Sequence, residues 1–205
     1  ESTGGGSYLP PADHDLPGKL TSCGRPWPGT EMAILGPDGA PLGEGEIGEI
    51  AIRGGIVMRR YWNRDAATAE TLAGGWLHTG DVGYRDADGF YYVHDRIKDM
   101  IVSGGENVYP AEVEGAIMGC PGVADVAVIG VPDDKWGEAV KALVVPAAGE
   151  QPDPARIIQW ARQRIAHYKA PKSVDFIPAL PRNPSGKILR RELRAPFWEG
   201  RSRAV

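Results

Sequence analysis

The sequence has few cysteines and no long apolar run, and both shortages exclude classes of protein. Cys23 and Cys120 are the only cysteines, and they lie far apart in the chain. Two distant cysteines are too few for a disulfide framework, so we expect reduced thiols and a cytoplasmic protein. No run of about 18 apolar residues occurs, so we expect no transmembrane segment. The first six residues, ESTGGG, lack the basic and apolar regions of a signal peptide.

A strong excess of one charge is also missing. The chain has 23 Lys and Arg residues against 27 Asp and Glu residues, for a net charge of −4. Such mild acidity offers no general attraction for nucleic acid, so we expect no nucleic-acid partner. The 42% hydrophobic and 24% charged residues are typical of folded proteins. A length of 205 residues is enough for one or two domains with a buried core.

The first half of the chain has short β patterns separated by turns. Residues 32–35, 46–53 and 90–94 each predict a strand, and residues 66–72 predict a short helix. The sequence DADG at 86–89 is typical of a hairpin turn that leads into the third of these strands. Residues 31–96 therefore predict a small antiparallel sheet or barrel.

The second half alternates between helix and strand patterns. Helices are predicted at 110–118, after Asp153-Pro154, and at 188–193, and strands at 124–131, 139–145 and 174–177. In the helix after Pro154, the predicted inner face consists of Ile158, Ala161, Ile165 and Tyr168. This alternation predicts a compact α+β or α/β domain. We expect an α+β protein with domains at 1–97 and 98–205.

Three patterns that are often found at ligand sites occur here in a sequence context that argues against such a site. Residues 43–48 match G-x-G-x-x-G, but they precede a strand and carry two glutamates that would repel phosphate, so a hairpin loop is favoured. The DADG turn has no bidentate acid further on to complete a calcium loop. The four histidines lack metal-ligand spacing, so we expect no zinc site.

Three longer motifs occur in order along the chain. They are GWLHTGDVG at 75–83, DRIKDMIVSGGENVYPAEVE at 95–114 and LPRNPSGKILRR at 180–191. With these motifs the chain resembles the superfamily of adenylate-forming enzymes. That superfamily includes acyl-CoA synthetases, nonribosomal peptide synthetase adenylation domains and beetle luciferases. The resemblance covers nearly the whole chain.

The resemblance implies which part of the family's enzymes each predicted domain corresponds to. Residues 1–97 would be the end of the large AMP-binding domain, and residues 98–205 the whole mobile C-terminal domain. The family's Ser/Thr/Gly-rich phosphate loop is not in the sequence. We therefore expect the chain alone to bind ATP poorly and to be inactive.

The resemblance also implies roles for individual residues in the first half-reaction, in which a carboxylate attacks the α-phosphorus of ATP and expels pyrophosphate. Asp81 would accept hydrogen bonds from the ribose hydroxyls, and Arg96 would add donors to the same ribose. Lys187 would be the catalytic cation that stabilises the developing charge. Taken singly, Asp81 could instead cap a turn, and Lys187 could be a solvated lysine. Glu1 resembles the acid of the family's Thr-Glu motif, which helps to hold Mg²⁺, although the preceding Thr is not in the sequence.

In the second half-reaction of the family, the acyl group moves from AMP to a thiol. Lys98 matches the hinge about which the C-terminal domain rotates between the two steps. Gly104 and Gly105 would let a pantetheine arm approach the backbone closely. Four further residues are predicted to contact CoA from matching positions, with ordinary packing as an equal alternative for the two aromatic ones: Trp136, Tyr168, Lys169 and Lys172.

The leading expectation for function is an ATP-dependent acyl-CoA synthetase. It would use ATP, Mg²⁺ and CoA, with a fatty acid or related carboxylic acid as substrate. Three alternatives stay open: adenylation for a carrier-protein thiol, a luciferase-type monooxygenase, and a non-catalytic binding fragment.

Overall fold

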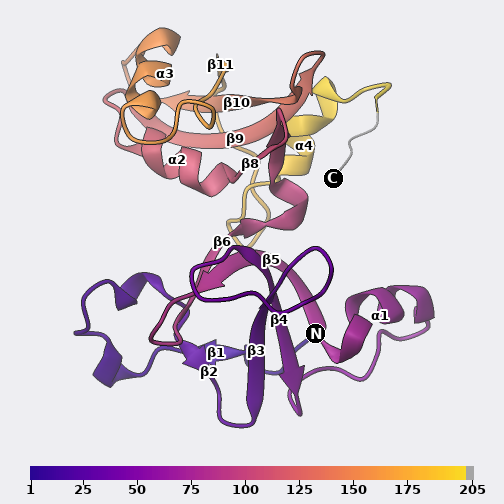
Figure 1. Ribbon diagram of the computed structural model, residues 1–205. Coiled ribbons are helices and arrows are strands. Elements are labelled where there is room, and N and C mark those ends of the chain that lie inside the picture. Colours follow the sequence, from indigo (N-terminus) through magenta and orange to yellow (C-terminus); the bar gives the residue numbers. More distant parts are fainter. Residues whose placement is uncertain (202–205) are drawn as a thin grey trace. The chain divides into compact units, whose positions relative to one another are not determined.

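The computed structural model describes residues 1–201 as two compact units, shown in Figure 1. Unit 1 spans Glu1–Ile97, and unit 2 begins at Lys98. The last four residues of the predicted second domain lie outside the described part. Each unit has its own sheet and its own hydrophobic core, so each is described by itself.

Unit 1 is built on a four-stranded antiparallel sheet with its strands in chain order. The strands are β3 (Thr30–Leu35), β4 (Gly48–Gly54), β5 (Leu77–Arg85) and β6 (Tyr91–Arg96). Ile34, Ile50 and Tyr91 form the buried cluster on this sheet. The predicted strands and the 86–89 hairpin are confirmed, and the open strand order makes this a sheet rather than a barrel.

Strand β5 was not predicted, because glycines interrupt its alternation. Gly80 has a φ of 71°, and the register with β4 shifts between Glu49 and Ala51. At Gly83 a Cβ atom would lie 2.1 Å from the carbonyl oxygen of Tyr92, so no larger residue fits there. The irregular part of β5 therefore lies within the motif at 75–83.

Shorter elements complete unit 1. A small hairpin pairs β1 (Ser7–Tyr8) with β2 (Arg25–Pro26). The predicted short helix is α1 (Asp65–Thr71). Single 3-10 turns are η1 (Pro11–Asp13), η2 (Lys19–Thr21) and η3 (Ala73–Gly75).

Unit 2 has a mixed five-stranded sheet around the long strand β10. Strands β9 and β7 pair with β10 in antiparallel fashion, β8 pairs with β7, and β11 pairs with β10 in parallel. Helix α3 (Pro154–Arg162) lies in the connection between β10 and β11, as a parallel pair requires a long crossover. The strands are β7 (Ile101–Ser103), β8 (Glu106–Val108), β9 (Val123–Asp133), β10 (Gly137–Pro146) and β11 (Ser173–Phe176).

Helices cover both faces of this sheet, as the alternation along β9 and β10 dictates. Val126, Val128, Val140 and Val144 face the main core, where α2 (Pro110–Met118) and α3 pack. Ile129 and Leu143 point to the other face. There they meet Leu193 of α4 (Arg190–Arg194) and Phe197 of η5 (Ala195–Phe197). Side chains of a strand alternate between faces, so one apolar strand serves two cores.

The predicted helices of unit 2 are confirmed, but Ala161 alone of the predicted inner face is a buried residue of α3. Asp153 caps α3, with its Oδ1 accepting a hydrogen bond from the Ala155 N–H at 3.0 Å. The helix ends at Arg162, so Ile165 and Tyr168 lie beyond it. Ile157 is the fully buried residue with Ala161, whereas Ile158 is only partly buried. The predicted face continued a 3.6-residue pattern past the true end of the helix.

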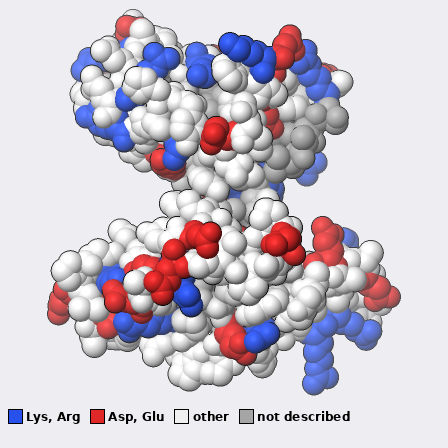
Figure 2. All heavy atoms as spheres, in the orientation of Figure 1, with Lys and Arg blue, Asp and Glu red and all other residues white. Residues whose placement is uncertain are grey.

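The α+β fold class is confirmed by these sheets and helices. Cys23 and Cys120 are both free thiols. No helix within residues 1–201 combines the length and the apolar character that spanning a membrane requires. Figure 2 shows basic and acidic side chains on the visible face of each unit, with neither sign forming a continuous field.

Candidate active site

Asp81 and Arg96 form an exposed ion pair on unit 1. They pair in register across β5 and β6, and Arg96 Nε lies 2.7 Å from Asp81 Oδ1. Their side chains are 31% and 47% exposed, so a ligand can reach both. A carboxylate has roughly four acceptor positions and a guanidinium has five N–H donors. Together the pair offers acceptors and donors to a ligand such as a vicinal diol.

Glu49 holds the turn that presents Asp81, and the sequence analysis missed it. One Glu49 oxygen accepts a hydrogen bond from the Gly80 N–H at 2.9 Å, and the other lies 2.7 Å from His78 Nδ1. Thr79 donates its hydroxyl to the Ile50 carbonyl at 2.6 Å and accepts a hydrogen bond from the Asp81 N–H at 3.1 Å. The irregular part of β5 is therefore fixed by the Glu49 side chain and the Ile50 carbonyl of β4, and by Thr79 of β5 itself. Glu49 could not be recognised from the sequence, because the residues that it contacts are about 30 positions further along the chain.

Glu1 lies on unit 1 with an exposed carboxylate. Tyr61 donates its hydroxyl to Glu1 Oε1, and this hydrogen bond raises the pKa of Tyr61. Mg²⁺ in nucleotide sites commonly takes one or two carboxylates together with substrate phosphates. A single exposed carboxylate fits that limited role. Within residues 1–201, no group of three or more His, Cys, Asp or Glu side chains could hold a metal ion.

Lys187 lies on a tight hairpin of unit 2. Arg182 and Ile188 form an isolated β-bridge at its base, and Asn183 organises its tip. Asn183 Oδ1 accepts hydrogen bonds from the Ser185 and Lys187 N–H groups at 3.0 and 2.9 Å. Arg182 adds a bond to the Gly186 carbonyl at 2.8 Å and an ion pair with Asp125 at 2.6 Å. The backbone under Lys187 is therefore held in place.

The side chain of Lys187 is exposed. Within residues 1–201, no carboxylate pairs with its amine. A held backbone with an unpaired ammonium suits a cation that neutralises a ligand.

Gly104 and Trp136 are in direct contact on unit 2. The Gly104 N–H donates to the Trp136 carbonyl at 2.8 Å, and Gly104 has a φ of 63°. A Cβ atom at Gly104 would lie 2.6 Å from the indole ring, so a side chain there would displace Trp136. Gly105, with a φ of 86°, completes the turn between β7 and β8. The Lys172 amine lies 6.0 Å from the centre of the indole ring, which is 41% exposed as a residue.

Tyr168 and Lys169 lie in a different setting. Lys169 Nζ donates to both oxygens of Glu112, at 2.8 and 2.7 Å. Partial burial would lower the pKa of Lys169, but the hydrogen bonds to Glu112 outweigh it and raise that pKa. Tyr168 is 44% exposed, beyond the end of α3. Of the two predicted phosphate-facing lysines, Lys169 is thus already neutralised by an acid, whereas Lys172 lies beside Trp136.

Lys98 begins unit 2 within the 3-10 turn η4 (Ile97–Asp99). Its side chain is exposed, and its carbonyl accepts a hydrogen bond from Arg194 Nη1 at 3.1 Å. The predicted hinge residue is therefore the first residue of unit 2, and its backbone contacts α4.

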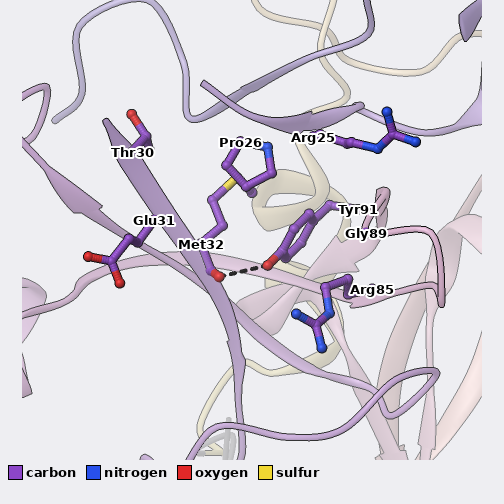
Figure 3. A pocket seen from close by; sticks show the side chains of 8 residues that line it. All are labelled: Arg25, Pro26, Thr30, Glu31, Met32, Arg85, Gly89 and Tyr91. Carbon is purple, nitrogen blue, oxygen red and sulfur yellow. Dashed lines mark hydrogen bonds between the residues drawn. The ribbon is translucent and has the colours of Figure 1, made fainter. Parts of the chain in front are cut away.

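Unit 1 also has a shallow hollow of about 410 Å³ that contains none of the predicted site residues (Figure 3). Arg85 and Tyr91, which pair in register next to the hairpin turn, lie on its wall. The Tyr91 hydroxyl donates to the Met32 carbonyl at 2.6 Å. Asp81 and Arg96 pair at the other end of β6. The hollow is therefore separate from the ion pair described above.

Two family models match the chain. Residues 1–62 match the AMP-binding enzyme model, and residues 112–187 match the model of the AMP-binding enzyme C-terminal domain. Together these matches cover more than half of the chain. The chain belongs to the AMP-binding, adenylate-forming enzyme family, and the second match ends at Lys187.

Curated relatives also match most of this chain. A feruloyl-CoA synthase of an Amycolatopsis species is 53% identical over 87% of this chain and 36% of the relative. The fatty acid–[acyl-carrier-protein] ligase ScoC of Streptomyces coeruleorubidus is 48% identical over 96% of this chain and 38% of the relative. The chain thus spans little more than a third of the length of these relatives.

A solved structure gives the same result for the fold. The o-succinylbenzoate CoA synthetase MenE of Bacillus subtilis, in complex with its acyl-adenylate intermediate OSB-AMP, matches with a TM-score of 0.81. The sequence identity is 41%, and the match covers 92% of this chain and 38% of MenE. The predicted family resemblance is confirmed.

Proposed function

We propose that this chain is the C-terminal part of an ATP-dependent, AMP-forming acyl-CoA synthetase. Residues 1–97 belong to the end of the AMP-binding domain, and residues from 98 onward form the mobile C-terminal domain. The enzyme joins a carboxylic acid to AMP and then transfers the acyl group to the thiol of CoA. The observation that carries the proposal is the Lys187 hairpin, because it ends a matched C-terminal domain with an unpaired cation on a fixed backbone.

In the first half-reaction, negative charge must approach negative charge. Catalysis is then mostly positioning and cation supply. Asp81 and Arg96 clamp the ribose through the acceptors and donors of their exposed ion pair. Lys187 stabilises the charge that develops between the carboxylate and the α-phosphate. Glu1 would supply one carboxylate to Mg²⁺, which neutralises phosphate charge when bound.

In the second half-reaction, the C-terminal domain turns about Lys98 and presents a different face. Gly105 leaves open space for a pantetheine arm, Gly104 lets the Trp136 ring lie against the backbone, and the partly exposed Trp136 ring is available for stacking. Lys172 supplies charge beside that ring. Lys169, which is paired with Glu112, and Tyr168 contribute at the margin of the same CoA site.

For the substrate, we propose a fatty acid or a related apolar carboxylic acid. The names of the matched relatives include a fatty acid ligase, a feruloyl-CoA synthase and an o-succinylbenzoate CoA synthetase. The acids tested must therefore include both aliphatic and aromatic chains. We also propose a cytoplasmic location, consistent with two free thiols and testable by cell fractionation.

The test uses the full-length protein that contains this chain. We expect acid-dependent exchange of labelled pyrophosphate into ATP, followed by consumption of CoA when CoA is added. The 205-residue chain alone, at the same concentration, should show no exchange. The proposal fails if the full-length protein forms neither acyl-AMP nor a thioester with any acid of the panel, or if the isolated chain is as active as the whole.

A carrier-protein thiol is the second candidate acceptor, favoured by the match to ScoC. Turnover with free CoA and with a phosphopantetheinylated carrier protein should be compared under identical conditions. Turnover with the carrier protein alone would replace CoA in the proposal and keep the adenylation step.

A further inference from the structure

Four charged side chains form a largely buried cluster in unit 2. Asp99 comes from η4, Glu114 from α2, and Arg190 and Arg194 from α4. Their side chains are only 11–18% exposed, although all four are ionisable. Buried charged groups are stable only when they are paired, so these four side chains must keep a fixed geometry relative to one another. We call these four residues the ion cluster.

The contacts of the ion cluster connect all four members. Arg190 Nη2 donates to both oxygens of Glu114, at 2.9 and 2.7 Å. Arg190 Nη1 lies 3.7 Å from Asp99 Oδ2, and Arg194 Nη1 lies 3.1 Å from Asp99 Oδ1. Two positive and two negative groups thus balance, and the charge-assisted bonds give them a defined arrangement.

The ion cluster also makes hydrogen bonds to the backbone. Arg194 Nη1 donates to the carbonyl oxygen of Lys98 at 3.1 Å. Glu114 Oε1 accepts a hydrogen bond from the Val128 N–H on β9 at 2.8 Å. The cluster therefore links the first residue of unit 2 and its longest strand to helix α4.

Helix α4 continues directly from the Lys187 hairpin. The Leu189 N–H donates to the Pro181 carbonyl at 2.9 Å, so the base of the hairpin closes one residue before the helix. α4 has only five residues, and such a short helix depends on tertiary contacts for its stability. Arg190 and Arg194 make polar contacts that hold α4 to the rest of unit 2, and Leu193 adds an apolar contact with the sheet. These two arginines thus act together with the Arg182–Asp125 ion pair in holding the Lys187 hairpin to the rest of unit 2.

We propose that Asp99 and Arg194 are positioning residues for Lys187. The ion cluster fixes α4 and the lysine hairpin to the backbone of Lys98. When unit 2 turns about Lys98, Lys187 then moves as part of a rigid body instead of trailing on a loose C-terminal segment. This inference rests on the proposed adenylation function, and it adds residues that neither contact the substrate nor supply charge to it.

The test uses the full-length enzyme with Arg194→Ala, Asp99→Asn and the conservative Arg194→Lys. We expect Arg194→Ala to lower the rate of pyrophosphate exchange by about 10- to 100-fold, because small misplacement of a catalytic group has effects of this size. Thioester formation from supplied acyl-AMP should be nearly unchanged, since Gly104 and Trp136 lie near β7 and not on α4. Arg194→Lys should recover part of the lost exchange.

A matched control is Asp175→Asn, which breaks the Lys141–Asp175 ion pair of 2.8 Å on the sheet of the same unit. This variant should leave exchange near the wild-type rate. The decisive comparison is made in a Lys187→Ala background. There, Arg194→Ala should cause no further loss of exchange, because a positioning residue has nothing left to position.

Each outcome bears on one claim. If the wild-type enzyme forms no acyl-AMP, the proposed function is wrong. If the wild type is active and both Arg194→Ala and Asp99→Asn keep its rate of pyrophosphate exchange, the positioning role alone is overturned. Equal losses in both half-reactions, or a full additional loss in the Lys187→Ala background, would show a general effect on folding and would also overturn it.

Discussion

At the scale of single residues, the ion pair between Asp81 and Arg96 is central to the proposed function. Their ion pair has one Nε–Oδ1 bond of 2.7 Å and considerable exposure on both sides. Surface ion pairs contribute little to stability, typically about 0–1 kcal/mol. For this exposed pair, with Glu49 behind it, we therefore propose a role in ligand binding rather than in stability.

The first prediction concerns Asp81. In the full-length enzyme, Asp81→Ala should raise the KM for ATP about 10- to 100-fold, because hydrogen bonds to charged groups contribute about 1.5–3 kcal/mol and each 1.4 kcal/mol is tenfold. Steady-state kinetics with ATP as the varied substrate measure this. Asp88→Ala, in the hairpin turn of the same sheet, is the control and should leave the KM unchanged. An unaltered KM in Asp81→Ala would remove Asp81 from the nucleotide site.

Asp86 shows a second residue-scale effect, on stability. Its partial burial would raise its pKa, but Lys19, the Phe90 N–H and the Tyr92 hydroxyl all donate to it and lower the pKa to about 2. A carboxyl whose folded-state pKa lies below its unfolded value stabilises the fold above the unfolded pKa. That contribution is lost as the pH falls from about 4 through 2.

We therefore predict a pH-dependent difference between the wild type and Asp86→Asn. The free energy of unfolding of the wild type should exceed that of the variant at pH 5 to 7, and the two should converge as the pH falls through about 2. Urea unfolding of the 205-residue chain at a series of pH values measures the difference. A constant difference over this range would mean that the ionised carboxyl does not supply the stability.

At the scale of elements, much of the secondary structure could be predicted because propensity and tertiary packing agree. α2 begins at Pro110 and ends at Met118, as expected from the residue types alone. β9 and β10 are apolar on both faces, since helices cover both sides of their sheet. The missed strands β5, β7 and β8 are interrupted or bounded by glycines, whose left-handed φ values break the alternation that marks a strand.

The candidate site was predictable only in part, for a related reason. Asp81, Arg96 and Lys187 belong to motifs that are continuous in sequence. Glu49 and the ion cluster act through contacts between distant residues, such as Asp99 with Arg194. A single sequence has no mark of such pairs, because the fold alone brings them together. The residues that hold the candidate site were therefore missed, whereas the residues proposed to touch the ligand lie within the sequence motifs.

The hinge gives a prediction at this scale. Proline locks its own φ near −65°, so Lys98→Pro should restrict rotation between the two steps. In the full-length enzyme, formation of the thioester from acid, ATP and CoA should slow more than pyrophosphate exchange does. Lys98→Ala, which keeps the backbone free, should affect both steps less. Equal slowing of both half-reactions in Lys98→Pro would argue against a hinge at this residue.

At the scale of the whole molecule, the chain is a family member that spans little more than a third of its curated relatives. It contributes the proposed ribose clamp on unit 1 and the proposed catalytic lysine on unit 2. The proposed activity therefore belongs to the full-length enzyme, and its central claim is that one amine in the C-terminal domain serves adenylation only.

The most direct measurement compares the two half-reactions in full-length wild type and Lys187→Ala. The account predicts that pyrophosphate exchange falls about 10²- to 10³-fold, as expected when one stabilising donor is removed from a developing charge. Thioester formation from supplied acyl-AMP should persist at close to the wild-type rate. Undiminished exchange in the Lys187→Ala enzyme would contradict the account.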